Sequence, residues 1–430
     1  MLPIILVQAY LNLTLFVFAF GPWEYPVSDL SRVVNYVLLA HLALFLGYLW
    51  GVRGRGGAYR GHLKVNRLLR IASFVTLLMI LPTSLLNTGK LVPDVLFGLQ
   101  NPGEAYAIYQ EARIASTPVA AYFRMLIGPL LALPLPLTAF YWGSLRRSSK
   151  ILGLSAVLGN MALNVAMGVN QGVTLPIVLA PFFILVAILA RRTRPTKGQW
   201  VGIVAGSMLA IAGALTFFTS TATERSGSGA ASGTFIQIGA AADRENFLVR
   251  GLPDAAVIGV FGLTGYLGQG YYGLSLAMDK PFIPMYGIGH STFLYRQAVR
   301  ITGNEELAHL AYPERISDED GWTAVQFFQT IYPWFASDVG FGGAIFVVGL
   351  IGCLFGSAYR DALRGDNPYA VGFLGQLFVM LLYFPALNAV LQGGEGLAAF
   401  WGLCIAWRVT RRRWVVERRV VPIPAINEGA

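Results

Sequence analysis

Charged residues are scarce in this chain. Asp, Glu, Lys and Arg together make up 13% of its 430 residues, whereas hydrophobic residues make up 55%. A soluble globular domain of ordinary composition carries roughly 25% charged residues. The composition therefore argues against a soluble domain and favours a chain that lies largely within a lipid bilayer.

Cysteine, histidine and the usual motifs of soluble enzymes are also scarce. The two cysteines, Cys353 and Cys404, both lie in apolar runs, so we expect small core residues rather than a disulfide or a metal pair. There are four histidines, and the two expected on one face, His290 and His309, are far apart in sequence, which is a poor metal signal. The sequence contains no GxxxxGK[ST] loop, GxSxG elbow or HExxH helix. We expect neither a metal nor a cofactor.

Long apolar runs dominate instead. A helix needs about 20 apolar residues to cross a bilayer, and about ten runs approach that length. The expected fold is an all-α polytopic membrane protein with a large external region. The runs that we expect to span are 2–20, 33–51, 69–88, 119–142, 151–169, 173–190, 200–219, 338–358, 368–387 and 390–407.

Positive charge is sorted along the chain. Most of the lysines and arginines lie in short segments between or after the apolar runs, at 52–70, 143–150, 191–199, 359–367 and 408–419. Short loops rich in Lys and Arg stay in the cytoplasm, so both termini are predicted to be cytoplasmic. This bias accounts for the net charge of +10, and we expect no nucleic-acid partner.

The topology divides the chain into four parts. Residues 1–219 would form an N-terminal bundle of about seven spans and 338–407 a C-terminal bundle of about three. Residues 220–337 would form the large external region, and 408–430 a basic cytoplasmic tail. Within the external region, residues 254–276 are apolar and rich in glycine, which suits a helix that bends, re-enters or packs closely on its neighbours. We predict a re-entrant or interfacial segment there, and whether it spans is left open.

Arginines beside the spans are candidates for binding an anionic substrate. The planar guanidinium matches two phosphate oxygens at once. A charge within a span is costly and usually faces the protein interior or a wet cavity, which singles out Arg124. The alternative for each is that it snorkels or pairs with a nearby acid. The candidates are Arg124, Arg225, Arg244, Arg250 and Arg296.

Two further residues are candidates for acid–base chemistry. His290 lies in the glycine-flanked loop MYGIGHST, which suits the presentation of an imidazole as a general base near neutral pH. The alternative is a solvent-exposed loop histidine. Asp338 begins the predicted span 338–358, where a helix N-cap would by itself account for an aspartate.

One long stretch resembles a known family. Residues 328–388 begin FQTIYPWFASDVGFGGAIFVV and resemble the C-terminal part of bacterial O-antigen polymerases of the Wzy type, which join oligosaccharide repeat units. The resemblance rests on the turn Asp338-Val339-Gly340-Phe341-Gly342-Gly343 after Trp322-Thr323, and on GYLGQGYYGLSL, YGIGHSTF and TFFTSTATER upstream. One departure is Asn170-Gln171-Gly172, where such proteins often carry an arginine-containing turn.

The resemblance implies a multi-pass glycosyltransferase of the bacterial inner membrane. It would move a growing glycan from its undecaprenyl-diphosphate carrier to the next lipid-linked repeat unit at the outer face, with lipid diphosphate as leaving group. Arg225, with Arg124 and Arg244, would hold the diphosphate, and His290 would be the base. A chain-length-regulating protein is a candidate partner. The aromatic residues that would stack on sugars are Tyr271, Tyr272, Trp322 and Trp334.

Three alternatives remain open. A lipid-linked-glycan ligase, which transfers finished polymer to another acceptor, would need the same residue types. A metal-dependent transferase of polyprenyl-phosphate sugars usually has adjacent acids in its first external loop, whereas Glu24 and Asp29 are separated here. A transporter would show paired charges near the midplane and repeated halves, and the predicted spans carry little charge and no visible repeat.

Overall fold

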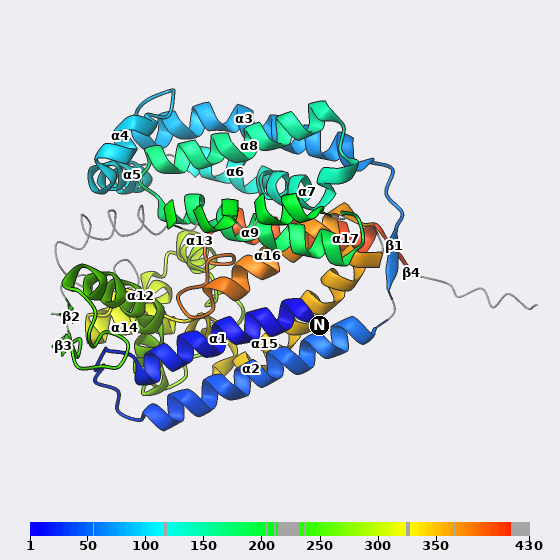
Figure 1. The fold of residues 1–430 in the computed structure, drawn as a ribbon. Coiled ribbons are helices and arrows are strands. Elements are labelled where there is room, and N and C mark those ends of the chain that lie inside the picture. Colours follow the sequence, from blue (N-terminus) through cyan, green and yellow to red (C-terminus); the bar gives the residue numbers. More distant parts are fainter. Residues whose placement is uncertain are drawn as a thin grey trace, which may run out of the picture.

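The computed structural model is largely helical and confirms the all-α class. It describes residues 1–54, 56–115, 118–193, 195–202, 205–209, 212–213, 233–235, 238–323, 327–364 and 366–413. Long helices lie side by side across the molecule (Figure 1), and the strands among the described residues are only two or three residues long.

The long helices are arranged in three layers (Figure 1). The first layer contains α3 (Val65–Thr88), α6 (Pro118–Leu131), α7 (Pro134–Tyr141) and α8 (Arg147–Ala166). The middle layer contains α9 (Asn170–Leu189), α16 (Pro368–Tyr383) and α17 (Gly394–Val409). The third contains α1 (Leu2–Phe20), α2 (Leu30–Arg53) and α15 (Ile331–Arg364).

Seven described helices are long and apolar enough to cross a membrane, which supports a multi-pass membrane protein. They are α1, α2, α3, α8, α9 and α15, and the segment Tyr122–Ser144, which covers most of α6 together with α7. The predicted spans 368–387 and 390–407 correspond to the shorter helices α16 and α17, each of 16 residues. Much of the predicted span 200–219 lies outside the described residues. The total of ten spans therefore stays a prediction.

Close backbone contact joins α2 to α15. A Cβ atom at Gly47 would clash with the carbonyl oxygen of Gly349, and one at Gly352 would clash with that of Leu44. Small residues allow membrane helices to approach at this range without a hydrophobic driving force between them. The glycines of α2 and α15 thus place the second half of α15 firmly in the third layer.

Residues 254–276 fold without a break. They belong to α12 (Asp254–Met278), one continuous helix of 25 residues. The bend considered from the sequence is not found, whereas the close packing is. A Cβ atom at Gly270 would clash with the carbonyl oxygen of Pro385, and one at Gly265 would lie 3.2 Å from the Trp23 ring. The glycines of α12 therefore make room for neighbouring chain segments, and re-entry into a membrane stays a prediction.

The described parts of the predicted external region gather at one end of the bundle (Figure 1). Beside α12, the region contributes α13 (Thr292–Thr302), α14 (Tyr312–Asp320), β2 (Thr234–Phe235) and β3 (Ala240–Ala241), with the 3-10 turn η3 (Glu305–His309) between α13 and α14. The helices α4 (Val95–Gln100) and α5 (Pro102–Ala115), which follow α3, lie at the same end. At the opposite end, β1 (Gly57–Tyr59) pairs antiparallel with β4 (Arg411–Arg413). The described parts of the basic segments and of the predicted external region thus lie at opposite ends of the bundle.

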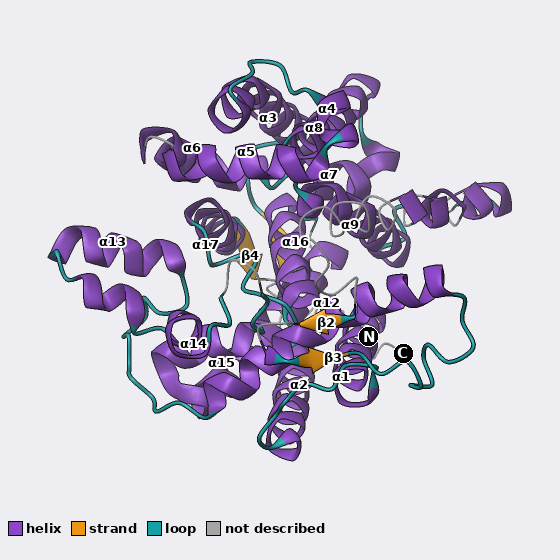
Figure 2. Ribbon diagram, turned by 90° about the vertical axis from the view of Figure 1, so that its left-hand side faces the viewer, coloured by secondary structure: helices purple, strands orange, loops and turns teal. Residues whose placement is uncertain are grey.

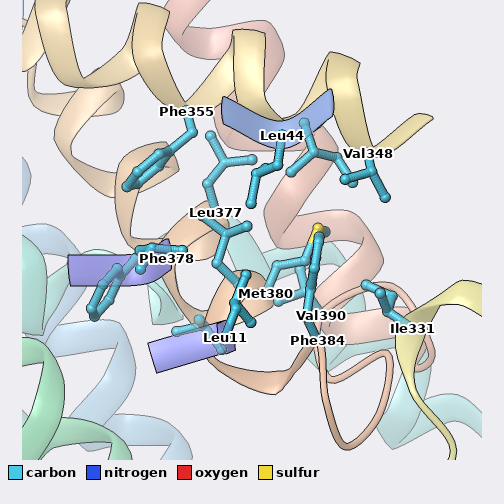
Figure 3. Packing of buried hydrophobic residues seen from close by; sticks show 14 of the residues in the cluster. Leu11, Leu44, Ile331, Val348, Phe355, Leu377, Phe378, Met380, Phe384 and Val390 are labelled. Atoms are coloured by element: carbon cyan, nitrogen blue, oxygen red, sulfur yellow. The ribbon is translucent and has the colours of Figure 1, made fainter. Parts of the chain in front are cut away.

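The main core lies where α1, α2, α15 and α16 meet. Leu11, Leu44, Val348 and Leu377 point toward one another there (Figure 3) and are fully buried. The loop after α16 continues this core, because the backbone N–H of Ile331 donates to the carbonyl oxygen of Phe384 over 2.9 Å. That bond fixes the start of α15 against the end of α16.

Candidate functional site

The site begins at a break within α15. Gly340 has φ 70° and ψ 169°, a conformation open almost only to glycine, and it interrupts the helical backbone between Ile331 and Arg364. Asp338 therefore lies in the last turn of a short helical segment that precedes the break. It is not the N-cap of the spanning segment, which corrects the structural alternative considered from the sequence.

The carboxylate of Asp338 instead holds the loop before α13. Its Oδ1 accepts from the backbone N–H groups of Gly287 (2.8 Å) and Gly289 (2.7 Å). Its Oδ2 accepts from the backbone N–H of His290 over 3.0 Å. The Asp338 side chain is 8% exposed, and a buried carboxylate is tolerated because donors surround it.

The backbone of this loop is shaped for that role. Tyr286 and Gly287 have φ of 51° and 93°, which lies in the left-handed region. The turn that they form aims the backbone N–H groups of Gly287, Gly289 and His290 at the one carboxylate, as in the anion-binding concavities of other turns. Gly289 has no room for a side chain, because a Cβ atom there would lie 2.7 Å from Cβ of Ser337. The glycines in YGIGH thus allow Asp338 to approach.

His290 is oriented by the same carboxylate. Its Nδ1 lies 2.8 Å from Asp338 Oδ2, and an ionised carboxylate only accepts, so Nδ1 carries the proton. In the neutral ring Nε2 then holds a lone pair. Nε2 has no hydrogen-bond partner among the described residues and is not one of their buried unpartnered atoms. With the side chain 20% exposed, this is the arrangement of an oriented general base.

The loop between α16 and α17 supports His290 from the other side. The fully buried Asn388 donates its Nδ2–H to the carbonyl oxygen of His290 over 2.7 Å. Ser291 Oγ and the backbone N–H of Phe293 both donate to the carbonyl oxygen of Gln392. Figure 2 looks at the bundle from this end and shows α13 beside α14 and α15. His290 is therefore held by segments from three parts of the chain.

A second polar contact lies beside this loop. Arg124 of α6 donates from Nε to Glu395 Oε2 (2.8 Å) and from Nη2 to Oε1 (3.0 Å), and from Nη1 to Thr83 of α3. Gly394, next to Glu395, packs against the Phe293 ring. The guanidinium fork of Arg124 is thus occupied by a carboxylate. This ion pair is the alternative to phosphate binding that the sequence left open.

The remaining arginine candidates are dispersed. Arg244 lies 3.4 Å from Asp254 and Arg250 lies 4.0 Å from Glu245, in pairs that are more than 70% exposed. Arg296 is exposed on α13, three residues along the chain from Phe293. Arg225 lies outside the described residues. Of the four arginine candidates that the structure describes, Arg124 and Arg296 lie on helices that contact the His290 loop and its neighbours.

The four aromatic candidates are buried. Tyr271 bonds through its hydroxyl to Thr14 Oγ1 over 2.9 Å, and Trp322 stacks on Phe327 with ring centroids 4.1 Å apart. Rings covered in this way present no open face to a sugar in this structure, so their role in sugar stacking gains no support. The four residues are Tyr271, Tyr272, Trp322 and Trp334, all at most 5% exposed.

Three residues of the site were missed from the sequence. Asn388 lies in the gap between the apolar runs 368–387 and 390–407, although a lone Asn in FPALNAVLQ was a usable signal, and Glu395 lies inside the second of these runs, in the first turn of α17. Tyr295 donates its hydroxyl to Glu314 beneath the loop, and burial together with the Glu314 charge raises the pKa of Tyr295. It therefore remains a protonated donor at neutral pH.

No metal-like cluster is found among the described residues, since no three or more His, Cys, Asp or Glu side chains converge there. Comparison with known proteins finds no matching family model, no matching curated protein and no matching solved structure. The chemistry of the site therefore has to be argued from its own geometry.

Proposed function

We propose that this chain is a membrane glycosyltransferase that polymerises undecaprenyl-diphosphate-linked repeat units at the outer face of a bacterial inner membrane. The observation that supports this most is the His290–Asp338 pair, whose Nδ1–Oδ2 distance is 2.8 Å. It combines an oriented imidazole with an open Nε2, in the loop directly before α13, and α13 lies at the end of the bundle where the predicted external region gathers (Figure 1).

The proposed reaction places a proton on His290. A hydroxyl of the acceptor sugar gives its proton to Nε2 as its oxygen bonds to the anomeric carbon of the donor. The bond between that carbon and the diphosphate oxygen breaks, and the electron pair leaves with the lipid diphosphate. Asp338 stabilises the imidazolium that forms, because it already accepts from Nδ1. A positioned base contributes roughly 10²- to 10⁴-fold to the rate of such a step.

The leaving diphosphate needs positive charge at its oxygens. Arg225 keeps this role in the proposal on the strength of its place in TFFTSTATER. Arg296 is the described candidate, because it is exposed on α13, the helix that begins directly after His290 and Ser291. Arg124 is less suited, because Glu395 already occupies its fork.

The setting of the proposal follows from the charge sorting. Both termini would be cytoplasmic, the lipid-linked donor and acceptor would enter from the bilayer, and a chain-length-regulating protein would be a partner. The first residue and β4 lie toward the same end of the bundle (Figure 1), which is compatible with termini on one side. A lipid-linked-glycan ligase would use the same base and leaving group and is separated from a polymerase only by its acceptor.

Purified protein in proteoliposomes provides the test. Synthetic undecaprenyl-diphosphate repeat units from the source organism are added, and the products are resolved on a gel. A ladder of glycan lengths supports the polymerase, whereas transfer only to an added lipid acceptor supports the ligase. Flux of substrate across the vesicle without any new glycosidic bond would support a transporter and remove the proposal.

A matched control is available within the chain. His309 pairs with Asp318 through the same atoms, Nδ1 and Oδ2, over 2.7 Å, but its side chain is 63% exposed. We expect His290→Gln to lower turnover by roughly 10²-fold or more, while His309→Gln leaves it unchanged. Equal turnover in the two variants would exclude His290 as the base.

A further inference from the structure

Polar side chains occur near the middle of two apolar helices at the edge of the bundle. Gln8 and Asn12 belong to α1, and His41 belongs to α2. Both helices run along the outer side of the third layer (Figure 1). Hydrocarbon offers no hydrogen bonds, so a polar group at this depth is costly unless another protein group satisfies it.

Part of that need is met within the chain. Asn12 Oδ1 lies 3.2 Å from His41 Nδ1, and Gln8 Nε2 donates to the carbonyl oxygen of His41 over 2.8 Å. Asn12 Nδ2 donates to the carbonyl oxygen of Gln8 over 2.8 Å. These bonds join α1 to α2, which is the structural role that the three side chains already have.

Part of the hydrogen-bonding capacity stays unused. The Asn12 side chain is exposed, which leaves its second N–H and a lone pair on Oδ1 without partners among the described residues. His41 is 3% exposed, and its Nε2 is buried without a partner among the described residues. A buried polar atom without a partner costs free energy. The side chains of Asn12 and His41 are therefore incompletely satisfied within one copy of the chain.

The exposed amide of Asn12 lies in a groove. It has a volume of about 360 Å³ and lies between α1 and α2. Its polar floor is Gln8, Asn12 and His41, and its exposed apolar rim includes Ile5 (53%) and Leu42 (51%). The groove is thus a long apolar surface with a hydrogen-bonding centre at mid-depth, which suits an apolar helix that carries a single amide.

We propose that a second copy of this chain occupies the groove, with α1 of each copy lying against the other and Asn12 paired with the partner's Asn12. A carboxamide carries both a donor and an acceptor, so a two-fold axis satisfies both amides at once. Interhelical hydrogen bonds of Asn and Gln associate helices within membranes. The inference is independent of the proposed glycosyl transfer.

Cysteine cross-linking in native membranes tests the geometry. In a chain with Cys353 and Cys404 replaced by alanine, Ile5→Cys and Leu6→Cys are compared with a short bifunctional maleimide reagent. The two positions are equally exposed, at 53% and 48%, but point about 100° apart around the helix. Only Ile5 lines the groove. We expect a cross-linked dimer from Ile5→Cys and little from Leu6→Cys, and equal or absent products from both would overturn the proposal.

The role of the amide is tested separately. Single-molecule photobleaching of the full chain in lipid vesicles gives the dimer fraction as a function of density. Asn12→Leu is expected to weaken dimerisation roughly tenfold. His41→Leu removes the same Asn12–His41 bond but leaves the amide, and we expect it to keep the dimer. Equal loss in both variants would mean that the polar groups only hold α1 to α2, and an unchanged dimer in Asn12→Leu would exclude the amide pair.

Discussion

His290 Nδ1 lies 2.8 Å from Asp338 Oδ2, although 48 residues separate the two in the sequence. The contact joins a glycine-rich loop to the end of a short helical segment that Gly340 separates from a spanning helix. Asp338 also accepts backbone N–H groups of the same loop, so one carboxylate sets both the loop conformation and the imidazole tautomer.

Replacing the Asp338 carboxylate with an amide tests its two roles, which are to orient the His290 ring and to supply a negative charge. Asp338→Asn keeps the shape but brings an NH₂ group toward N–H donors, and it removes the charge that stabilises an imidazolium. We expect turnover to fall by roughly 10²-fold or more and the free energy of unfolding to fall by about 1–3 kcal/mol. Turnover in proteoliposomes and thermal unfolding are measured, with Asp318→Asn at the exposed pair as control. Full activity in Asp338→Asn would contradict the role.

Gly340 is required for its backbone conformation rather than for space. The nearest atom to a Cβ placed there is Phe282 Cδ1 at 3.8 Å, so alanine would fit, but φ of 70° with ψ of 169° would be strained. We expect Gly340→Ala to lower the free energy of unfolding by about 1–3 kcal/mol. Gly342→Ala is the control, because no atom lies within 4 Å of its Cβ and its φ is not positive. Similar thermal stability of the two variants would argue against the break.

Much of the fold could be predicted from composition and charge order alone. Spanning helices come from long apolar runs, and the run 2–20 matches α1 to the residue. The short helical segment before Gly340 was missed because YPWFASD has no long apolar run and carries Pro333, a residue that reads as a helix boundary.

The site was predicted less well, since its contacts join distant residues. His290 is a candidate from the sequence because glycines flank it, but its pairing with Asp338 depends on the break at Gly340. Arg124 and Glu395 are 271 residues apart, so no local pattern shows that they meet. Aromatic residues such as Trp322 look alike in sequence whether they are exposed for sugars or buried, and Trp322 is fully buried.

The exposed pair of His309 and Asp318 gives a pH dependence of stability. The hydrogen bond that His309 donates to Asp318 raises the pKa of His309 above its usual 6.5. The folded state therefore binds this proton more tightly than the unfolded state. Its contribution is fully present below pH 6.5 and is lost as pH rises through the higher folded value. We expect His309→Gln to remove this part of the pH dependence of thermal unfolding, and identical pH profiles for the variant and the natural chain would contradict it.

Variants of the ion pair between Arg124 and Glu395 can show whether the charge of Arg124 has a structural or a functional role. Their side chains are 26% and 40% exposed, and both oxygens of Glu395 accept from the guanidinium, so the pair is partly screened but bidentate. If Glu395 is the natural partner, Arg124→Gln and Glu395→Gln should each destabilise the protein, and the double variant should lose less than the sum. We expect a coupling free energy of about 1 kcal/mol from this cycle.

Arg124→Lys separates the structural role from the phosphate-binding role, because lysine keeps the charge but loses the fork. Lower stability with unchanged turnover per folded molecule would confirm the structural role. Unchanged stability with reduced turnover would instead mean that Glu395 gives way to the substrate diphosphate, and Arg124 would regain the phosphate-binding role predicted from the sequence.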